Sequence, residues 1–237
     1  MFTSSKKWLG KTIKNYTILQ KLGEGRYGVT YLATTPQDEI VVIKRFKPLM
    51  FKLNKKKNAY EAVLLSQIDH SGIPKMLGVI NVKGFYGFVL EYIPGTTIEK
   101  VIFQQNYQFT NSEIFHIGIQ LIQIIKYLHH LGIVHRDIRI PNVLLNNNKV
   151  SLIDFGLARW IDNEEYTFEQ DFSYLGDFLL YLHYSSFHKN EKYNRPWYEE
   201  LDLSDPQIQC YKKLLRLAPP YTTINQVEKD FLKVWGR

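Results

Sequence analysis

Cysteine is nearly absent from this chain, and long apolar runs are missing. The 237 residues include one cysteine, Cys210, which excludes an intramolecular disulfide and gives no reason to expect an oxidising compartment. No stretch of about 18 apolar residues occurs, and the N-terminus lacks the unbroken apolar core of a signal peptide. We therefore expect a soluble, cytoplasmic protein with no transmembrane segment.

Acidic residues are fewer than basic ones, 23 against 30, which gives a formal net charge of +7. This excess suits contact with acidic partners, but it informs on association more than on fold. An apolar content of 45% with 14% aromatic residues predicts a packed globular protein. The length suits one sizeable domain or two small lobes.

One stretch, residues 135–156, reads HRDIRIPNVLLNNNKVSLIDFG and alternates polar turns with apolar runs. We expect strands at 143–145 and 150–153, with the polar groups at their ends, where loops on a rigid scaffold often carry catalytic residues. The alternative is a pair of Asp/Asn turns whose side chains cap backbone amides. The polar side chains on these turns are Asp137, Arg139, Asn142 and Asp154.

These residues resemble the protein-kinase family. The catalytic-loop pattern HRDxxxxN is met by residues 135–142, and the DFG motif begins at Asp154. The resemblance implies that Asp137 orients the acceptor hydroxyl and takes its proton, while Asn142 and Asp154 bind Mg²⁺. It places Arg139 near the γ-phosphate of ATP.

Residues 16–33 contain two β-rich runs around a GxGxxG turn, a spelling shared with dinucleotide-binding folds. A dinucleotide fold would open a helix next, whereas the chain continues here as a strand. In the kinase family the glycines bring backbone amides to phosphate, and Val29 matches the residue that covers the adenine base. The nucleotide-contacting residues implied here are Leu22, Gly23, Gly25, Gly28 and Val29.

Lys44 ends the apolar run of EIVVIKRF and matches the lysine of the family's VAIK motif, with Val42 in place of the alanine. A lysine that closes a strand is ordinarily a solvated end residue. The resemblance implies instead that Lys44 binds the α- and β-phosphates and pairs with a glutamate on the following helix. Glu61 is the matching glutamate, because apolar residues follow it at helical spacing.

A basic run with interleaved apolar residues extends from Lys47 to Lys57. Its ordinary meaning is a solvated loop and the start of a helix. The apolar residues leave open a docking surface for an acidic protein partner, an anionic membrane or, less favoured, nucleic acid.

Residues 73–90 predict two further strands, and residues 91–95 then break the pattern and resemble a kinase hinge. The backbone of Glu91 and Ile93 would bind the adenine edge, with Leu144 also contacting the nucleotide. A plain linker between lobes is the alternative, and both interpretations can hold together.

The fold class expected is α+β, with two lobes like those of a protein kinase. A small antiparallel sheet lobe with one main helix is expected at 13–90, after an N-terminal tail at 1–12. The hinge at 91–95 leads to a reduced, mainly α-helical larger lobe at 96–237.

Apolar residues at helical spacing predict a buried helix over 110–132, with Thr110 and Glu113 forming a capping box. The adjacent residues His129 and His130 do not predict a metal site, because neighbours point apart on a helix and no third ligand follows at zinc spacing.

The chain departs from the family after DFG. Only the fourteen residues 157–170 precede Asp171, which matches the start of the family's long central helix, and no APE motif occurs among them. Pro220 and Tyr221 stand where the family has the arginine that pairs with the APE glutamate. We therefore expect a shortened or rebuilt platform for peptide docking.

Three functions follow from these patterns. The first is an ATP- and Mg²⁺-dependent protein kinase of the small bacterial type, acting on a serine or threonine of an unidentified protein. The second is a nucleotide-binding interaction module with little transferase activity, which the shortened segment favours. The third is a small-molecule kinase of the same fold.

Tyr166 and Thr167 are possible phosphorylation sites within reach of Arg136.

Overall fold

The chain forms two compact units, Met1–Ile93 and Pro94–Arg237. The boundary between the two units falls inside residues 91–95, the segment predicted to be a hinge. Side chains at residues 6 and 55–59 lie outside the described part of the structure. The backbone ranges described by this computed structural model are 6–53, 55–82, 84–162, 164–187 and 195–236.

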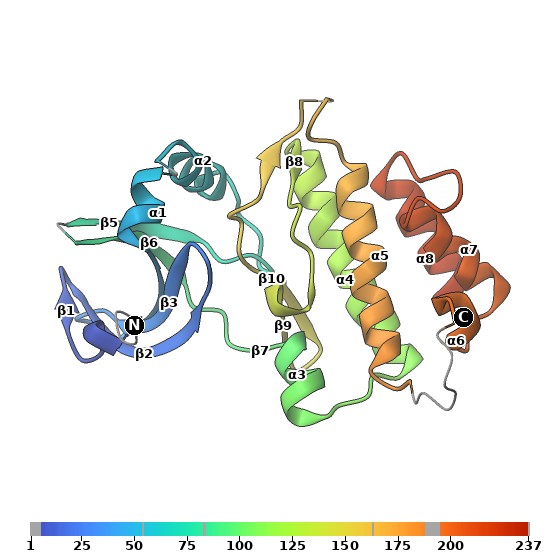
Figure 1. Ribbon diagram of the computed structural model, residues 1–237, viewed down its shortest axis with the longest axis horizontal. Coiled ribbons are helices and arrows are strands. Elements are labelled where there is room, and N and C mark those ends of the chain that lie inside the picture. The colour runs from blue at the N-terminus through green and yellow to red at the C-terminus, as the bar shows by residue number, and fades with distance from the viewer. Residues whose placement is uncertain (1–5, 54, 83, 163, 188–194, 237) are drawn as a thin grey trace. The chain divides into compact units, whose positions relative to one another are not determined.

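Unit 1 is built on a six-stranded antiparallel sheet with the order β1-β2-β3-β4-β6-β5 (Figure 1). The last two strands were expected over 73–90, and β5 begins only at Met76, after Pro74, which has no N–H for a ladder. The strands are β1 (Thr12–Ile13), β2 (Tyr16–Glu24), β3 (Gly28–Thr34), β4 (Ile40–Phe46), β5 (Met76–Val82) and β6 (Phe85–Glu91). The helices are the 3₁₀ turn η1 (Lys6–Trp8), α1 (Pro48–Leu53) and α2 (Lys55–Ser66).

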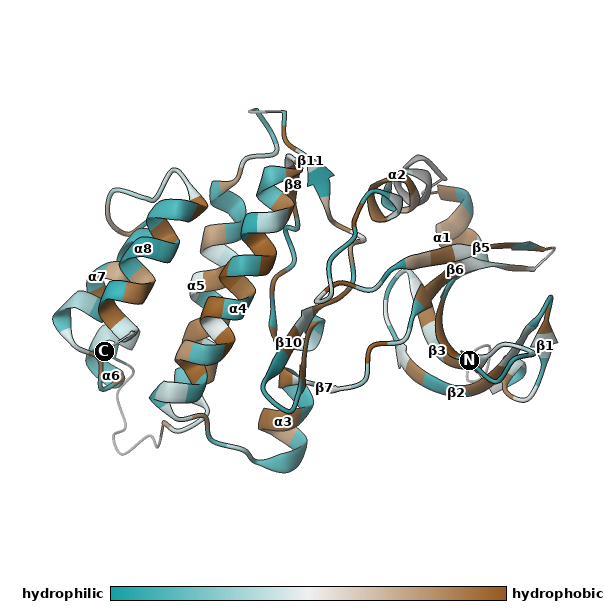
Figure 2. Cartoon of the chain, turned by 180° about the vertical axis from the view of Figure 1, so that it is seen from behind, coloured by the Kyte–Doolittle hydropathy of each residue, from teal (hydrophilic) through white to brown (hydrophobic). Residues whose placement is uncertain are grey.

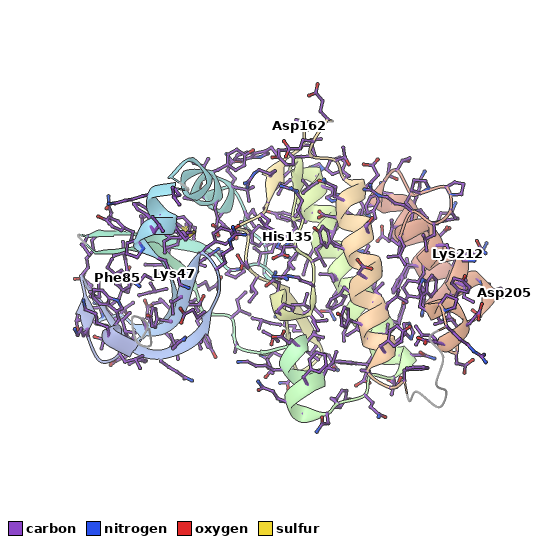
Figure 3. All side chains as sticks on the ribbon, in the orientation of Figure 1. Lys47, Phe85, His135, Asp162, Asp205 and Lys212 are labelled. Carbon is purple, nitrogen blue, oxygen red and sulfur yellow. The ribbon has the colours of Figure 1, made fainter. Side chains whose placement is uncertain are left out.

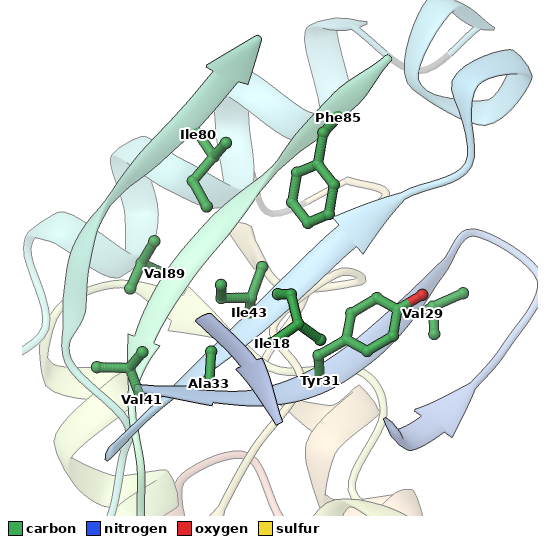
Figure 4. Packing of buried hydrophobic residues seen from close by; sticks show 9 residues of the cluster. All are labelled: Ile18, Val29, Tyr31, Ala33, Val41, Ile43, Ile80, Phe85 and Val89. Atoms are coloured by element: carbon green, nitrogen blue, oxygen red, sulfur yellow. The ribbon is translucent and has the colours of Figure 1, made fainter. Parts of the chain in front are cut away.

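One apolar cluster of unit 1 lies on one face of the sheet, because side chains alternate between the two faces of a strand. On β3 and β4 the buried positions recur at every second residue. Figure 4 shows the resulting cluster, in which strands far apart in the sequence contribute to one apolar layer. Its buried members are Ile18, Val29, Tyr31, Ala33, Val41, Ile43, Ile80, Phe85 and Val89.

Part of the segment expected as an N-terminal tail belongs to this unit. Trp8 packs against the cluster and meets Phe85 edge-on with ring centroids 4.9 Å apart. The Gly10 N–H donates to the Ile18 carbonyl at 2.9 Å. The sequence around Trp8 has no periodic pattern that would predict this contact. One large aromatic ring on a short turn is enough to dock the segment on the sheet.

Unit 2 is mainly helical, and α4 and α5 run along each other in it (Figure 1). Figure 2 shows hydrophobic residues recurring along α4 between hydrophilic ones, and the buried residues Ile114, Ile117, Leu121, Ile125 and Leu128 lie at helical spacing. Thr110 and Glu113 form the predicted capping box at the start of α4. The helices are α3 (Ile98–Gln105), α4 (Asn111–His130), the 3₁₀ turn η2 (Ile140–Asn142), α5 (Glu169–Tyr184), α6 (Trp197–Glu200), α7 (Asp205–Leu214) and α8 (Ile224–Trp235). The strands are β7 (Thr96–Thr97), β8 (Ile133–Val134), β9 (Val143–Asn146), β10 (Lys149–Leu152) and β11 (Arg159–Trp160).

Helix α8 packs closely on α4. A Cβ atom added to Gly118 would lie 2.5 Å from the ring of Phe231, so the helices approach as closely as a glycine allows. Beside this contact, Lys126 Nζ lies 2.6 Å from a carboxylate oxygen of Glu228. The C-terminal helix is thus part of the core of unit 2.

Tyr221, which stands where the family has an arginine, belongs to a different buried contact. Its hydroxyl donates to Oδ2 of Asp230 at 3.0 Å and lies 3.3 Å from the Cys210 sulfur. Lys213 Nζ lies 3.0 Å from the same Asp230 oxygen. A phenol thus stands at the position where the resemblance predicts an arginine. Within the described ranges, no helix has the length and apolar character needed to cross a bilayer.

Candidate active site

Unit 1 contributes a lysine and glutamate pair. The register of β3 and β4 places Thr30 opposite Lys44 and Leu32 opposite Val42, so these four residues share the face of the sheet away from the apolar cluster. Lys44 Nζ lies 2.6 Å from Oε1 of Glu61 on α2, and the two side chains are 15% and 5% exposed. The ion pair implied by the family resemblance is present, and it holds the ammonium group at the sheet surface.

Val29 was predicted to cover the adenine base, and the structure contradicts this. Val29 is 2% exposed and belongs to the apolar cluster, on the face opposite Lys44 (Figure 4). A shift of one residue along a strand moves a side chain to the other face. Thr30, which pairs with Lys44, is therefore the β3 residue beside the lysine. The alternation of side chains along β3 is the sequence signal that could have identified Thr30.

The structure gives different reasons for glycine at the three positions of the loop. A Cβ on Gly28 would lie 2.4 Å from the carbonyl oxygen of Arg45, so packing between β3 and β4 requires glycine there. A Cβ added to Gly23 or Gly25 would meet no heavy atom within 4 Å in the part of the chain that the structure describes. Packing inside the protein does not explain these two glycines, whereas backbone approach to a ligand would.

A network of charges supports the glycine loop. Lys47 Nζ donates to the Gly25 carbonyl at 2.9 Å and lies 3.1 Å from Glu24 Oε1. Hydrogen bonds from Lys21 and Lys47 lower the pKa of Glu24 to about 2. Lys47, labelled in Figure 3, is therefore engaged within its own unit and does not add a free cation to the predicted docking surface. The side chains of Lys55, Lys56 and Lys57 lie outside the described residues.

The other residues predicted to contact nucleotide come from both units. Leu22 is 38% exposed beside an irregularity in the β2 ladder. Glu91 pairs with Val41 at the end of β6 and accepts a hydrogen bond from the Lys75 N–H at 3.2 Å, and Ile93 is the last residue of unit 1. Leu144, on β9 of unit 2, is half-buried.

The catalytic loop of unit 2 surrounds Asp137 with donors. Nε of Arg139 lies 2.8 Å from Oδ1 of Asp137, and Nδ2 of Asn142 donates to Oδ2 at 2.7 Å. The same Asn142 nitrogen also donates to the Asp137 carbonyl at 2.9 Å. Two acceptors thus fix the orientation of the Asn142 amide and direct its oxygen elsewhere. Asp137 is 14% exposed and Arg139 is 60% exposed, so the ion pair joins a largely buried carboxylate to an arginine that reaches solvent.

Asp171 holds the backbone of this loop. It is 0% exposed and accepts hydrogen bonds from the backbone N–H groups of His135 (2.9 Å) and Arg136 (2.8 Å) and from Nε2 of His129 (3.0 Å). Arg136 has a φ of 65°, which costs a non-glycine residue about 1–2 kcal/mol. The buried carboxylate offsets that strain. His129 is thus a partner of Asp171, and sequence reasoning missed this anchoring role of the aspartate.

His135 supports the loop from inside. It is fully buried, and Nδ1 accepts a hydrogen bond from the Asp137 N–H at 3.3 Å (Figure 3). Its ring meets Phe155 of the DFG motif edge-on with centroids 4.7 Å apart. Burial lowers the pKa of His135, although nearby carboxylates oppose the shift. A neutral imidazole therefore joins the HRD and DFG turns.

Asp154 lies at the start of the DFG turn with a φ of 67°, and its Oδ1 accepts the Gly156 N–H at 3.2 Å. Just before it, the Ile153 N–H donates to the Asn142 carbonyl at 2.8 Å. The antiparallel pairing of β9 with β10, as predicted from the apolar runs, brings these turns together. Asn142 therefore precedes this short hairpin, and Asp154 follows it.

The segment 157–170 is attached at several points. Its strand β11 pairs with β8, directly before the catalytic loop. Asp162, near the tip of the following turn in Figure 3, accepts the N–H groups of Glu164 and Tyr166 at 3.0 and 2.8 Å. The ring of Phe168 packs against that of His129 in a tilted arrangement, with centroids 4.3 Å apart.

A sequence model of the protein kinase domain matches residues 16–190. The chain belongs to the protein kinase family. This kinase is 35% identical over 227 residues to the probable serine/threonine-protein kinase YbdM of Bacillus subtilis (strain 168), a match that covers 91% of this chain and 87% of YbdM. The α+β fold class and the resemblance to small bacterial kinases are confirmed.

Two relatives from other organisms share a shorter stretch. The CTD kinase subunit alpha of Schizosaccharomyces pombe is 33% identical over 153 residues, which cover 61% of this chain and 25% of that protein. Nek11 of Homo sapiens is 31% identical over 156 residues, which cover 62% of this chain and 24% of Nek11. The enzyme is thus a protein kinase, in a family that generally uses ATP and Mg²⁺.

Proposed function

We propose that this kinase transfers the γ-phosphate of ATP, in the presence of Mg²⁺, to a serine or threonine hydroxyl of a protein. The observation that carries the proposal is the environment of Asp137, a carboxylate held by Arg139 and Asn142 in a loop that a buried aspartate anchors. Acceptance of a hydroxyl proton requires such a positioned carboxylate. The serine or threonine acceptor is supported by the name of YbdM.

Lys44 is proposed to bind the α- and β-phosphates. An ammonium group on a flexible stem needs a fixed partner to hold one position, and Glu61 provides it at 2.6 Å. Gly23 and Gly25 are proposed to bring backbone N–H groups to the phosphates, in keeping with the open space where their Cβ atoms would lie. Gly28 serves the packing that shapes the same loop.

Asn142 and Asp154 are proposed to hold Mg²⁺. Amide and carboxylate oxygens are the hard ligands that Mg²⁺ prefers. Both N–H groups of the Asn142 amide point at Asp137, so its oxygen is the atom available to a cation. Bound Mg²⁺ would neutralise charge on the phosphates, and Arg139 would add a second cation near the γ-phosphate.

The adenine base is proposed to contact the backbone of Glu91 and Ile93 and the side chains of Leu22, Val42 and Leu144. Thr30 is proposed to cover the base in place of Val29, because Thr30 shares a sheet face with Lys44. The basic residue Lys52 on α1 is exposed, and a docking role for this helix is compatible with an acidic protein partner.

The test is transfer from labelled ATP with Mg²⁺, using the wild type and Asp137→Asn, with generic acceptor proteins and with small alcohols. We expect incorporation into protein as phosphoserine or phosphothreonine, and a loss of at least about a hundredfold in rate for Asp137→Asn. ATP affinity should stay near that of the wild type. Asp202→Asn, an exposed acid of the same unit, is the matched control.

Each alternative function has its own outcome in this assay. ATP binding without transfer to any acceptor would identify a nucleotide-binding interaction module. Transfer confined to small alcohols would identify a small-molecule kinase. Loss of ATP binding together with transfer in Asp137→Asn would show that the substitution collapses the loop.

A further inference from the structure

The guanidinium group of Arg136 lies between the catalytic loop and the segment 157–170. Its NH1 donates to the Leu157 carbonyl at 3.3 Å, and its central carbon lies 4.4 Å from the ring centroid of Tyr166. Among the described residues, no carboxylate lies within ion-pair distance of this guanidinium. An aromatic ring and a carbonyl dipole thus solvate the cation.

The backbone fixes Tyr166 in its position. Its N–H donates to Oδ1 of Asp162 at 2.8 Å, and its carbonyl accepts the Asp162 N–H at 3.2 Å. These two bonds close a tight turn that presents the ring to the arginine. Because Tyr166 is half-buried, the contact with Arg136 is partly shielded from solvent.

Arg136 needs support because of where it stands. It is directly followed by Asp137, and its own backbone has a left-handed conformation at φ 65°. Asp171 holds its N–H at 2.8 Å, and the Tyr166 ring holds its side chain. The orientation of Asp137 therefore depends on a residue that is fixed at both ends.

We propose that Tyr166 is a positioning residue, whose ring on Arg136 keeps the catalytic loop in its working conformation without a phosphate on the segment 157–170. This inference rests on the proposed function. A phosphate would offer charge-assisted bonds to the guanidinium. Here the ring occupies its face, and the short segment is already tied by β11, by the Asp162 turn and by Phe168.

The ring and the hydroxyl of Tyr166 can be separated by substitution. Tyr166→Phe keeps the cation–π contact and removes the only site for a phosphate on this residue, whereas Tyr166→Ala removes both. Thr167→Ala removes the neighbouring hydroxyl. Tyr181→Ala, a tyrosine on α5 that is 53% exposed, is the matched control for loss of a ring elsewhere in unit 2.

The experiment measures kcat and the KM for ATP on phosphatase-treated full chains whose dephosphorylation is verified by intact mass. We expect the treated wild type, Tyr166→Phe, Thr167→Ala and Tyr181→Ala to keep the kcat of the untreated protein. For Tyr166→Ala we expect kcat to fall about tenfold, which corresponds to about 1.4 kcal/mol, with little change in KM. A loss of packing alone would be expected to change stability without this split.

A second readout does not depend on activity. The ring should shift the NMR signal of the Arg136 side-chain Nε–H in the wild type and in Tyr166→Phe, and the shift should vanish in Tyr166→Ala. Unchanged kcat in Tyr166→Ala would overturn the proposal. Equal losses of kcat in Tyr166→Phe and in the dephosphorylated wild type would also overturn the proposal, because they would assign the role to a phosphate. If the wild type shows the NMR shift but transfers no phosphate, the proposed function fails and the positioning role of Tyr166 fails with it.

Discussion

Replacement of Asp171 by asparagine tests how the catalytic loop is held. In the wild type, Oδ2 accepts from His129 and His135, and Oδ1 accepts from the Arg136 N–H. An asparagine has one acceptor oxygen. We expect it to face the two donors His129 and His135, which leaves the amide NH₂ directed at the N–H of Arg136.

The magnitude follows from these contacts. A buried N–H left without an acceptor costs about 1–3 kcal/mol, and each of the two surviving bonds weakens by about 1 kcal/mol when its acceptor becomes neutral. Removal of the buried charge lowers its own desolvation cost and offsets part of this loss. We therefore expect Asp171→Asn to lower the free energy of unfolding by about 3 kcal/mol.

Urea unfolding measures this loss, and amide hydrogen exchange locates it. The Arg136 N–H should lose protection, and kcat should fall because Asp137 follows that residue. Asp177→Asn on the exposed side of the same helix is the control. If Asp171→Asn unfolds like the wild type and keeps the protection of Arg136, the anchoring role assigned to the carboxylate is wrong.

Three other predictions concern metal, packing and pH. Asp154→Asn should abolish Mg²⁺-dependent turnover; a magnesium titration that matches the wild type would remove its metal role. Gly28→Ala should lower the free energy of unfolding by about 1–3 kcal/mol because of overpacking, since its Cβ would lie 2.4 Å from a backbone oxygen. Gly25→Ala should leave the free energy of unfolding unchanged and raise the KM for ATP. If urea unfolding shows a larger loss of stability for Gly25→Ala than for Gly28→Ala, both assignments are wrong. Burial lowers the pKa of His183 from 6.5 to about 4. The unfolded chain therefore binds a proton more readily, and stability that is complete above pH 6.5 falls as the pH drops toward 4. His183→Phe should reduce this slope by up to about 1.4 kcal/mol per pH unit, as measured by unfolding at several pH values; an unchanged slope would place the titration elsewhere.

Local pattern was sufficient where the relevant partners follow a regular period. The VAIK-like motif at Lys44 and the helical spacing after Glu61 predicted the ion pair through the family resemblance, and the apolar runs around Asn142 predicted the hairpin that leads to Asp154. The capping box of α4 followed from two side chains three residues apart. In each case the sequence separation is short or the element is regular.

Contacts between segments far apart in the sequence could not be predicted from local pattern. The bonds from Asp171 to the catalytic loop span about 35 residues, and nothing in the local sequence distinguishes a helix-start aspartate from a buried anchor. The docking of Trp8 on the sheet depends equally on tertiary packing. Val29 was misplaced for a different reason, because an offset of one residue in a strand exchanges its faces.

The packing of α8 on α4 has a practical consequence for anyone who expresses part of this protein. The kinase-domain match ends at residue 190, yet α8 fills the groove at Gly118 with the ring of Phe231 and buries Trp235. A fragment trimmed at residue 190 would present the apolar side of α4 to water and would be expected to aggregate. The recognisable motif and the smallest folding unit therefore have different C-terminal limits in this enzyme.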